Sequence, residues 1–549
     1  MRNRAVVSGV TVNVVAGTHV VSLGMDLSDA RRKGCLGFAI QREDHTEDER
    51  QWMRGLKTFE ETDPGLGPGE TVSSRQHPFQ GFQWADYSAK PNHDYTYTVI
   101  PLKGNPAALE EGPAVAVPIH TEPELGRPHS VFFNRGAIAS QEYARRFLNI
   151  APDKLEGEDQ VAAYRWLSRG LLEALLAFID RADGPRFSLH GAMYEFTRDE
   201  VLSALGAAAR RGVDTRIVYD GIPGGSAKEP NERAIAANHI KSICKPRTLG
   251  SLMHNKFLVL LDGGSPVAVW TGSTNISENG IFGQLNVGHL VEDPAVAGAY
   301  HEYWERLRAD IDRVDLREWV GEHSPPVPVP PPEGTATMMS PRSGSSVLAD
   351  YAKLADVERP LFMTFAFGMD KRFRKVFERD DGALRVALME KEGNGAALPA
   401  ARIYIRELRR RRNVVVAVGE HTAVNALDRW QKERAHGIGR NVDWVHTKFL
   451  LLDPLSDDPV VISGSANFSV ASTSTNDENM LVIRGDRRVA DIYLGEFMRS
   501  FSHYAFREAL SFGTRPLGHL VTDPDDWQAR HFDEGDDHYL RRRYFAQSG

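Results

Sequence analysis

The sequence predicts an α/β protein of two related lobes, each a mixed sheet covered by helices, with a small β-sandwich domain before them. Three observations lead to this prediction. A polar motif occurs twice, with a constant separation of 192 residues. Strand-like and helix-like segments alternate around both copies, as in a sheet covered by helices. The first part of the chain instead consists of short strand-like runs separated by glycines and prolines.

The length and composition are those of a globular protein with several domains, because 549 residues exceed what one hydrophobic core holds. The net charge of −8 gives no overall attraction to nucleic acid or to anionic membranes. Two cysteines, Cys35 and Cys244, are too few for a disulfide framework or a cysteine-based zinc site and fit a reducing compartment. The basic start of the sequence has no continuous apolar run, so we expect no secretory signal, and no apolar run reaches membrane-spanning length. We therefore expect a cytoplasmic protein with no integral membrane segment.

Residues 1–122 are predicted to form a β-sandwich similar to a fibronectin-III or immunoglobulin-like domain. β-branched runs, Gly/Pro-rich turns and an aromatic strand follow one another in this region. The rings of Tyr95 and Tyr97 should lie on one face of that strand, because side chains alternate along a strand. Such a face serves either as a binding surface or as sandwich core, and the core interpretation is favoured.

Residues 123–323 are predicted to form the first lobe. Helical spacing over 164–179 is followed by a strand over 187–194, a helix over 199–211 that ends at Gly212, and a strand over 213–220. The segment after Lys256 is almost wholly apolar, which is typical of a strand buried on both faces.

Residues 324–336 are predicted to be a stiff proline-rich linker, with a docking segment for a proline-reading partner as the alternative. The second lobe, 337–549, repeats the alternation of helices and strands. Its Arg402–Arg412 segment is either a solvated basic face or a rim that attracts a phosphate-bearing substrate. The charged and aromatic last thirty residues have no assigned role.

The repeated motif carries the chemistry. Both copies have the form His-x-Lys, then an Asp at the end of an apolar run, then Gly-Ser-x-Asn. Two copies with equal spacing indicate an internal repeat rather than an accident. The residues are His254, Lys256, Asp262, Ser273 and Asn275 in the first copy, and His446, Lys448, Asp453, Ser465 and Asn467 in the second.

The polar residues of one copy suit a phosphate. Positions i and i+2 of a strand point to the same side, so the His and the Lys of each copy should face one pocket. Lysine, asparagine and serine can donate hydrogen bonds to phosphate oxygens. Histidine can act as nucleophile, acid or base near neutral pH. Two facing copies would therefore form a site that cleaves a phosphodiester by covalent catalysis.

The two copies resemble the twin HxKxxxxD motifs, with downstream GSxN, of the phospholipase D superfamily. The resemblance covers roughly residues 125–515 and is specific because the motif is duplicated. It implies two pseudo-twofold-related lobes, a phosphohistidine intermediate, and neither a metal nor another cofactor. His254, His446, Lys256 and Lys448 would be catalytic. Asn275, Asn467, Ser273 and Ser465 would bind phosphate.

The copies differ in their carboxylates. Asp453 lies seven residues after His446, as the family pattern requires, whereas Asp262 lies eight residues after His254, which indicates a local bulge or shifted turn. The second copy also has Asn476-Asp-Glu478, which we compare with Asn286-Val-Gly288 in the first, where the carboxylate is missing. Asp453, Glu478 and Asp262 are the candidate orienting carboxylates.

The two histidines should therefore have different roles. The resemblance favours His254 as the nucleophile, whereas the carboxylates favour His446. The expected partner is a phosphodiester substrate. A phospholipid is favoured, nucleic acid is the alternative, and a non-enzymatic binding module is the third reading. Because one chain contains both copies, the site needs no obligate oligomer.

Overall fold

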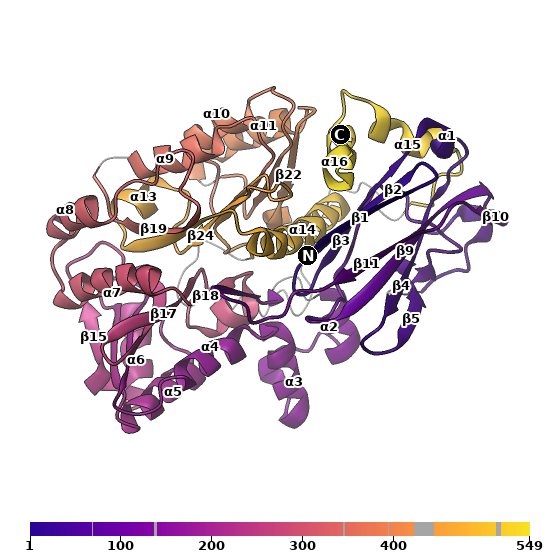
Figure 1. The fold of residues 1–549 in the computed structure, drawn as a ribbon. Coiled ribbons are helices and arrows are strands. Elements are labelled where there is room, and N and C mark those ends of the chain that lie inside the picture. The colour runs from indigo at the N-terminus through magenta and orange to yellow at the C-terminus, as the bar shows by residue number, and fades with distance from the viewer. Residues whose placement is uncertain are drawn as a thin grey trace.

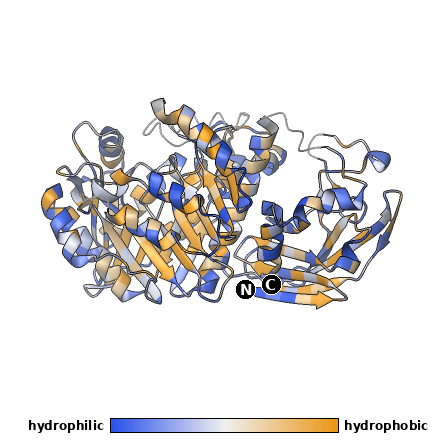
Figure 2. Ribbon diagram, turned by 90° about the horizontal axis from the view of Figure 1, so that it is seen from above, coloured by the Kyte–Doolittle hydropathy of each residue, from blue (hydrophilic) through white to orange (hydrophobic). Residues whose placement is uncertain are grey.

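The computed structural model describes residues 1–548 except 68–69, 137–139, 344–345, 394, 422–443 and 512–517. It contains an N-terminal pair of sheets and two lobes, each built on a seven-stranded sheet. Figure 1 shows the lobes above one another, with the N-terminal sheets beside them. In Figure 2 the strands of the lobes are mostly hydrophobic, whereas the outer helices mix polar and apolar residues. None of the described helices is long and apolar enough to cross a membrane.

The N-terminal region is a β-sandwich. Its sheets have the orders β1-β2-β3-β8 and β10-β9-β4-β5, with β11 paired to β9. Tyr95 and Tyr97 are buried in a core shared by both sheets, which confirms the core interpretation. The strands are β1 (Arg2–Val7), β2 (Val10–Ala16), β3 (Val21–Leu27), β4 (Gly37–Asp44), β5 (Glu49–Trp52), β8 (Gln83–Asp86), β9 (Asp94–Asn105), β10 (Ala108–Glu111) and β11 (Val115–His120), with short β6 (Arg54–Gly55), β7 (Val72–Ser73) and α1 (Asp29–Arg32) between them.

The first lobe has the sheet order β12-β18-β17-β16-β13-β14-β15, in which β13, β14 and β15 are parallel and the other pairs antiparallel. Its strands are β12 (His129–Phe133), β13 (Phe187–Met193), β14 (Asp214–Asp220), β15 (Cys244–Arg247), β16 (Lys256–Asp262), β17 (Ser265–Gly272) and β18 (Val287–Val291). Its helices are α2 (Ser140–Phe147), α3 (Gly157–Ser168), α4 (Leu171–Asp180), α5 (Asp199–Arg210), α6 (Lys228–Ala237), α7 (Pro294–Ala309) and α8 (Arg313–His323).

The second lobe repeats this topology with the order β19-β25-β24-β23-β20-β21-β22, which confirms the internal repeat. Its strands are β19 (Gly334–Ser340), β20 (Leu361–Phe365), β21 (Arg385–Met389), β22 (Val414–Val418), β23 (Phe449–Leu452), β24 (Val460–Gly464) and β25 (Glu478–Arg484). Its helices are α9 (Ser346–Ala355), α10 (Lys371–Phe377), α11 (Leu398–Leu408), α13 (Val470–Ser474) and α14 (Arg487–Ser511).

The lobes pack face to face. Residues of α4 and α5 form one core with the outer face of the first sheet. Residues of α7 and α14 form a second core together with the inner faces of both sheets. This core is continuous across both lobes, and the site lies where the central strands β16 and β23 of the two sheets begin.

Two sequence predictions need correction. The helical pattern over 164–179 is two helices, because Arg169 and Gly170 take positive φ values of 48° and 86° between α3 and α4. The proline-rich linker is shorter than predicted, because β19 begins at Gly334 and pairs with β25. The connector also packs against the lobe, since Val327 is buried and Arg484 donates to the Pro331 carbonyl at 2.6 Å.

The C-terminal segment joins the sandwich to the second lobe. Helix α16 (Asp537–Ala546) lies against β2, β3 and β8, and α15 (Pro524–Phe532) packs against α16. The Trp527 indole N–H donates to the Cys35 carbonyl at 2.7 Å, and Asn13 donates to the Phe545 carbonyl at 2.8 Å. A Cβ added at Gly24 would lie 2.1 Å from the Phe545 backbone, so α16 can approach β3 only over a glycine.

Candidate active site

The two motif histidines meet between the lobes. His254 lies just before β16 and His446 just before β23, so both leave equivalent strands of the two sheets. Their ring centroids are 6.3 Å apart, and only 6% and 7% of their surfaces are exposed. The repeat therefore forms one site rather than two.

Backbone hydrogen bonds cross between the lobes around both histidines. The His254 N–H donates to the Asp477 carbonyl at 3.0 Å, and the His446 N–H donates to the Leu285 carbonyl at 3.2 Å. These two bonds are related by the same 192-residue offset as the motifs. A pseudo-twofold axis therefore runs between the histidines, and each lobe holds the histidine segment of the other.

Side chains orient the rings in the same crossed way. His254 Nδ1 lies 2.8 Å from Glu478 Oε2, and His446 Nδ1 lies 2.9 Å from Asn286 Oδ1. The Asn286 amide is fixed in this orientation, because its Nδ2 donates to the Gly280 carbonyl at 2.8 Å. Both acceptors select the Nδ1–H tautomer, in which Nε2 of each neutral ring carries the lone pair.

This geometry corrects the sequence comparison. The residue 192 positions before Glu478 is Asn286, not Gly288, so the first copy has an amide where the second has a carboxylate. The sequence prediction that a carboxylate of the second copy supports His446 is also wrong for Glu478, because Glu478 contacts His254. The predicted asymmetry remains, but it is reversed. His254 has the charged partner and His446 the neutral one.

The lysines bring two positive charges into a buried site. Lys256 and Lys448 are nearly inaccessible, and each donates to the carbonyl of its own motif histidine. Burial lowers the pKa of Lys256 to about 7, and burial with the nearby Lys256 lowers the pKa of Lys448 well below its ordinary value. An anion bound between them would remove much of this cost.

Burial also disfavours charge on the other groups. Burial, followed by Lys256, lowers the pKa of His254 well below its ordinary value, and burial raises the pKa of Glu478 to about 7 against the opposing effect of Lys256. For His446, burial followed by Lys448 likewise lowers the pKa. The free site thus favours neutral histidines.

In both copies, the motif asparagine and the motif serine differ in their hydrogen bonds. Among the described residues, the buried side-chain oxygens of Asn275 and Asn467 have no hydrogen-bond partner. Ser273 Oγ donates to Asn286 Oδ1 at 2.8 Å, and Ser465 Oγ accepts from the Asn479 N–H at 3.0 Å. Each asparagine amide has an NH2 group that can donate to phosphate oxygens, so we keep the asparagines as proposed phosphate ligands. The serines are reassigned, because their hydroxyls hold the strand end of their own lobe.

The carboxylates that end the motifs lie far from the histidines. Asp262 pairs with Arg186, and Asp453 lies 3.3 Å from Arg359. Seven residues of extended chain, at ~3.3 Å each, place Asp453 ~20 Å from His446. The predicted orienting role of Asp262 and Asp453 is therefore not supported. The pairing of β16 with β17 shifts register between Leu260 and Leu261, where β17 has one extra residue, Val267, and this shift agrees with the predicted local irregularity.

The structure reveals carboxylates that the motif does not contain. Asp220 ends β14 and accepts from the Met253 N–H at 3.3 Å, and Glu390 follows β21 and accepts from the Val445 N–H at 2.7 Å. Each holds the residue before a motif histidine. The signal was present in the sequence, because both acids directly follow the second parallel strand of their lobes.

Glu195 is a further acid at the site. It is buried, accepts from Ser277 Oγ at 2.7 Å and hydrogen-bonds the Asn275 side chain. Beside it, the ring of Tyr194 lies 4.9 Å from that of His254. No spacing rule in the sequence pointed to either residue.

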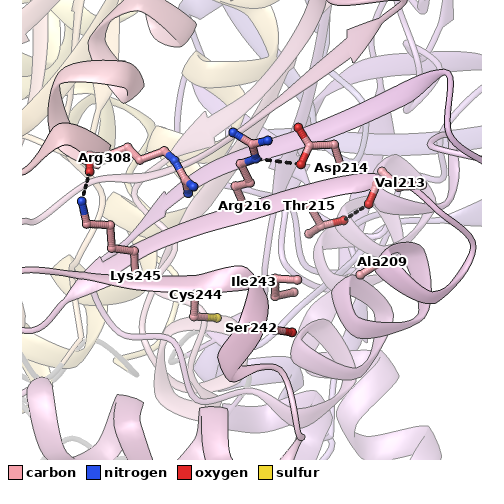
Figure 3. A pocket seen from close by; sticks show the side chains of 10 residues that line it. All are labelled: Ala209, Val213, Asp214, Thr215, Arg216, Ser242, Ile243, Cys244, Lys245 and Arg308. Atoms are coloured by element: carbon pink, nitrogen blue, oxygen red, sulfur yellow. Dashed lines mark hydrogen bonds and ion pairs between the residues drawn. The ribbon is translucent and has the colours of Figure 1, made fainter.

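Two other features lie away from the histidines. The hollow in Figure 3, about 530 Å³, is lined by Asp214, Cys244 and Arg308 among others. Asp214 and Cys244 begin β14 and β15, whereas the opposite strand ends approach His254. In the described part of the chain, the side chains with metal-ligand spacing are Asp536, Asp537 and His538, near which Arg530 pairs with both carboxylates.

Three of the six arginines in the Arg402–Arg412 segment form ion pairs. Arg402 pairs with Glu392 at 3.0 Å, Arg409 with Glu508 at 2.7 Å and Arg412 with Asp380 at 3.1 Å. These contacts favour the solvated basic face over a phosphate-attracting rim.

Two duplicated lobes thus share one site that contains paired histidines and lysines. The family model described as the cardiolipin synthase, phospholipase D-like domain matches residues 175–308 and 382–501. The chain therefore belongs to the phospholipase D superfamily, and the sequence resemblance is confirmed. A search of curated proteins finds no match.

Several solved structures share parts of this fold. The phosphatidylserine synthase of Haemophilus influenzae Rd KW20 aligns at 11% identity over 69% of this chain and 91% of its own, with a TM-score of 0.41. The phospholipase D family member Nuc of Salmonella typhimurium aligns at 26% identity over 25% of this chain and 87% of its own, with a TM-score of 0.22. The polyphosphate kinase of Porphyromonas gingivalis aligns at 11% identity over 58% of this chain and 46% of its own, with a TM-score of 0.36. The chain therefore spans about half the length of that protein.

Proposed function

We propose that the protein hydrolyses or transfers a phospholipid phosphodiester without a metal ion, through a covalent intermediate on His254. The contact between His254 Nδ1 and Glu478 across the lobes carries this proposal. When the ring attacks phosphorus through Nε2 it becomes positively charged, and a carboxylate at Nδ1 stabilises that charge more strongly than an amide does.

The reaction has two steps. His254 Nε2 forms a bond to phosphorus while the bond to the leaving oxygen breaks, and His446 donates the proton that this oxygen takes up. In the second step the neutral His446 removes a proton from water or an acceptor alcohol, whose oxygen displaces His254. The neutral Asn286 contact suits a ring that alternates between acid and base.

The charge of the phosphate is balanced by the chain itself. Lys256 and Lys448 supply positive charge from opposite lobes, and the amides of Asn275 and Asn467 can donate to the non-bridging oxygens. Binding a phosphodiester anion would raise the pKa of His446 and of both lysines, because it adds a negative charge close to them. The substrate thereby helps to protonate the acid that its cleavage requires.

The phospholipid is the favoured substrate for two reasons. The family model that matches is described as a cardiolipin synthase domain. The net charge of −8 and the ion-paired arginines of the Arg402–Arg412 segment do not favour a long polyanion. Both halves of the site come from one chain, so no second copy is needed to complete it.

The proposal is tested by trapping the covalent intermediate. The protein is incubated in EDTA with a phosphodiester that has a good leaving group, because the first step then needs no acid. His446→Ala should accumulate phosphorylated protein, since the base for the second step is missing. His254→Ala should show none. Mass spectrometry of peptides around both positions reads out the result.

The substrate class is decided by a parallel assay. Labelled phosphatidylcholine vesicles, single- and double-stranded DNA, and RNA are incubated with wild-type protein and with both histidine variants. Cleavage of lipid that is lost in both variants supports the proposal. Cleavage confined to nucleic acid overturns the lipid assignment, and activity that survives both substitutions overturns the mechanism.

A further inference from the structure

Three consecutive residues of each lobe face the histidine of the other lobe. They are Leu285-Asn286-Val287 opposite His446 and Asp477-Glu478-Asn479 opposite His254. The backbone contacts match on the two sides, since the Leu285 N–H donates to the Trp444 carbonyl at 2.8 Å and the Asp477 N–H to the Leu252 carbonyl at 2.9 Å. The side chains differ completely. Outer positions that are apolar in the first lobe are polar in the second.

Asn479 is the centre of a buried hydrogen-bond network on the His254 side. Its Oδ1 accepts from Thr271 Oγ1 at 2.8 Å and from the Tyr300 hydroxyl at 2.9 Å. Its Nδ2 donates to Asn255 Oδ1 at 2.7 Å. Thr271, Tyr300 and Asn255 all belong to the first lobe, so this one amide of β25 is tied to three elements of the other lobe.

The network runs beside the pair that carries the chemistry. Asn255 follows His254, and Asn479 follows Glu478. The bond between the two asparagine side chains is therefore parallel to the bond between His254 and Glu478, one residue further along both segments. A change in the separation of the lobes would stretch both bonds together.

A second tie lies on the other flank of Glu478. Arg247 Nε donates to Asp477 Oδ2 at 3.0 Å, and both side chains are fully buried. Arg247 is itself held by Asp310, at 2.9 Å. Glu478 is thus fixed across the lobes through both of its chain neighbours.

Among the described residues, the positions that mirror Asn479, Asn255 and Asp477 form no such side-chain bonds. Val287 stands 192 residues before Asn479, Thr447 stands 192 residues after Asn255, and Leu285 corresponds to Asp477. A fully satisfied buried network specifies one geometry, whereas apolar packing permits small shifts. The position of His254 is therefore fixed more tightly than that of His446.

We propose that Asn479 and Asn255 are positioning residues that hold His254 and Glu478 at their reactive separation, an inference that rests on the proposed function. They touch neither the phosphate nor the reacting atoms. Their effect is on the attack by His254, because a displacement of ~1 Å at a reacting group can slow a reaction ~100-fold. His446 only transfers protons, so small shifts in its position slow the reaction less.

The test uses the residues of the mirrored positions as substitutions. Asn479→Val and Asn255→Thr each break the amide–amide bond, and Thr447→Val changes the mirrored position as the matched control. We expect kcat to fall by roughly 10–100-fold in the first two, with KM changed less than threefold, and both to stay within twofold in the control. The rate at which phosphoprotein forms, measured in the His446→Ala background, should fall by the same factor.

Folding is checked by circular dichroism and thermal unfolding. Asn479→Val leaves the Thr271 and Tyr300 hydroxyls without their acceptor and is the more destabilising change. Asn255→Thr leaves those bonds intact and keeps the test decisive if Asn479→Val does not fold. The double variant should be no slower than the slower single variant, because both remove one bond.

Three results would overturn the inference. They are a folded Asn255→Thr protein with wild-type kcat, an equal loss in Thr447→Val, or a loss confined to KM. Failure of the proposed function looks different, since wild-type and His446→Ala proteins would then trap no phosphate on His254. Trapping on His254 together with unaffected asparagine variants would reject the positioning role alone.

Discussion

The two halves of the site share a backbone and differ in chemistry. In both, a strand end of one lobe accepts the N–H of the other lobe's histidine, and a side chain from that strand end orients the ring. The side chain is Glu478 for His254 and Asn286 for His446. The comparison shows that both halves orient the histidine ring, whereas only the half around His254 does so with an acidic residue. Orientation requires an acceptor at Nδ1, but stabilising a positively charged ring requires a carboxylate.

Replacing Glu478 with Gln makes both halves neutral and is expected to have the largest effect. The amide still accepts from His254, so the ring orientation survives, while stabilisation of the charged ring is lost. We expect kcat to fall ~100-fold, about 2.7 kcal/mol in activation free energy. Steady-state kinetics check this, with Asp453→Asn as a control far from the histidines. A fall of less than threefold would remove the distinction between the halves.

The pH dependence tests the charges common to both halves. Burial lowers the pKa of Lys256 to about 7, so the free protein loses this positive charge as the pH rises through 7. Below that value the lysine is protonated and can bind the anion. We expect kcat/KM to decline above about pH 7, and kcat to decline only at higher pH, because bound phosphate raises the lysine pKa. A flat kcat/KM between pH 6 and 9 would contradict the assignment.

Replacing Asn286 with Asp gives both halves a carboxylate. The new charge favours protonated His446, which hinders its action as a base in the second step. We expect a roughly 10-fold lower kcat, an alkaline shift of the acidic limb, and more trapped phosphoprotein than in wild type. Quench-flow mass spectrometry compares the phosphorylated fraction. If this fraction decreases instead, the roles assigned to the histidines are reversed.

The smallest effect is expected at the ends of the motifs. Asp453 pairs with Arg359 at the far end of its strand, and both side chains are partly exposed. We expect Asp453→Asn to change kcat less than twofold and the free energy of unfolding by less than ~1 kcal/mol. Denaturant titration and the lipid assay measure the two quantities. A tenfold loss of activity would restore the predicted orienting role.

The sequence predicted the architecture and most reacting groups, because the repeat and the strand patterns are local signals. The motif histidines and lysines are brought together as expected, and Asn275 joins them through its hydrogen bond to Glu195. The pairing of Glu478 with His254 could not be read from the sequence, since spacing associates a residue with its own copy. The orienting residue of one copy reaches the histidine of the other only because the two lobes pack together through α7 and α14. The register shift beside Leu260 agrees with the predicted irregularity. The length of the strand between His446 and Asp453 could already have excluded an orienting role for Asp453.

The meeting of α16 with β2 and β3 has a consequence for the order of folding. Asn13 and Phe545, which are hydrogen-bonded, are separated by 532 residues. At ribosomal rates of roughly 5–20 residues per second, the sandwich waits roughly 30–100 s for this part of its surface to be covered. During synthesis the nascent chain therefore displays the apolar face around Gly24 and Phe82 while both lobes are being made, and a chaperone that shields such faces would find its target there.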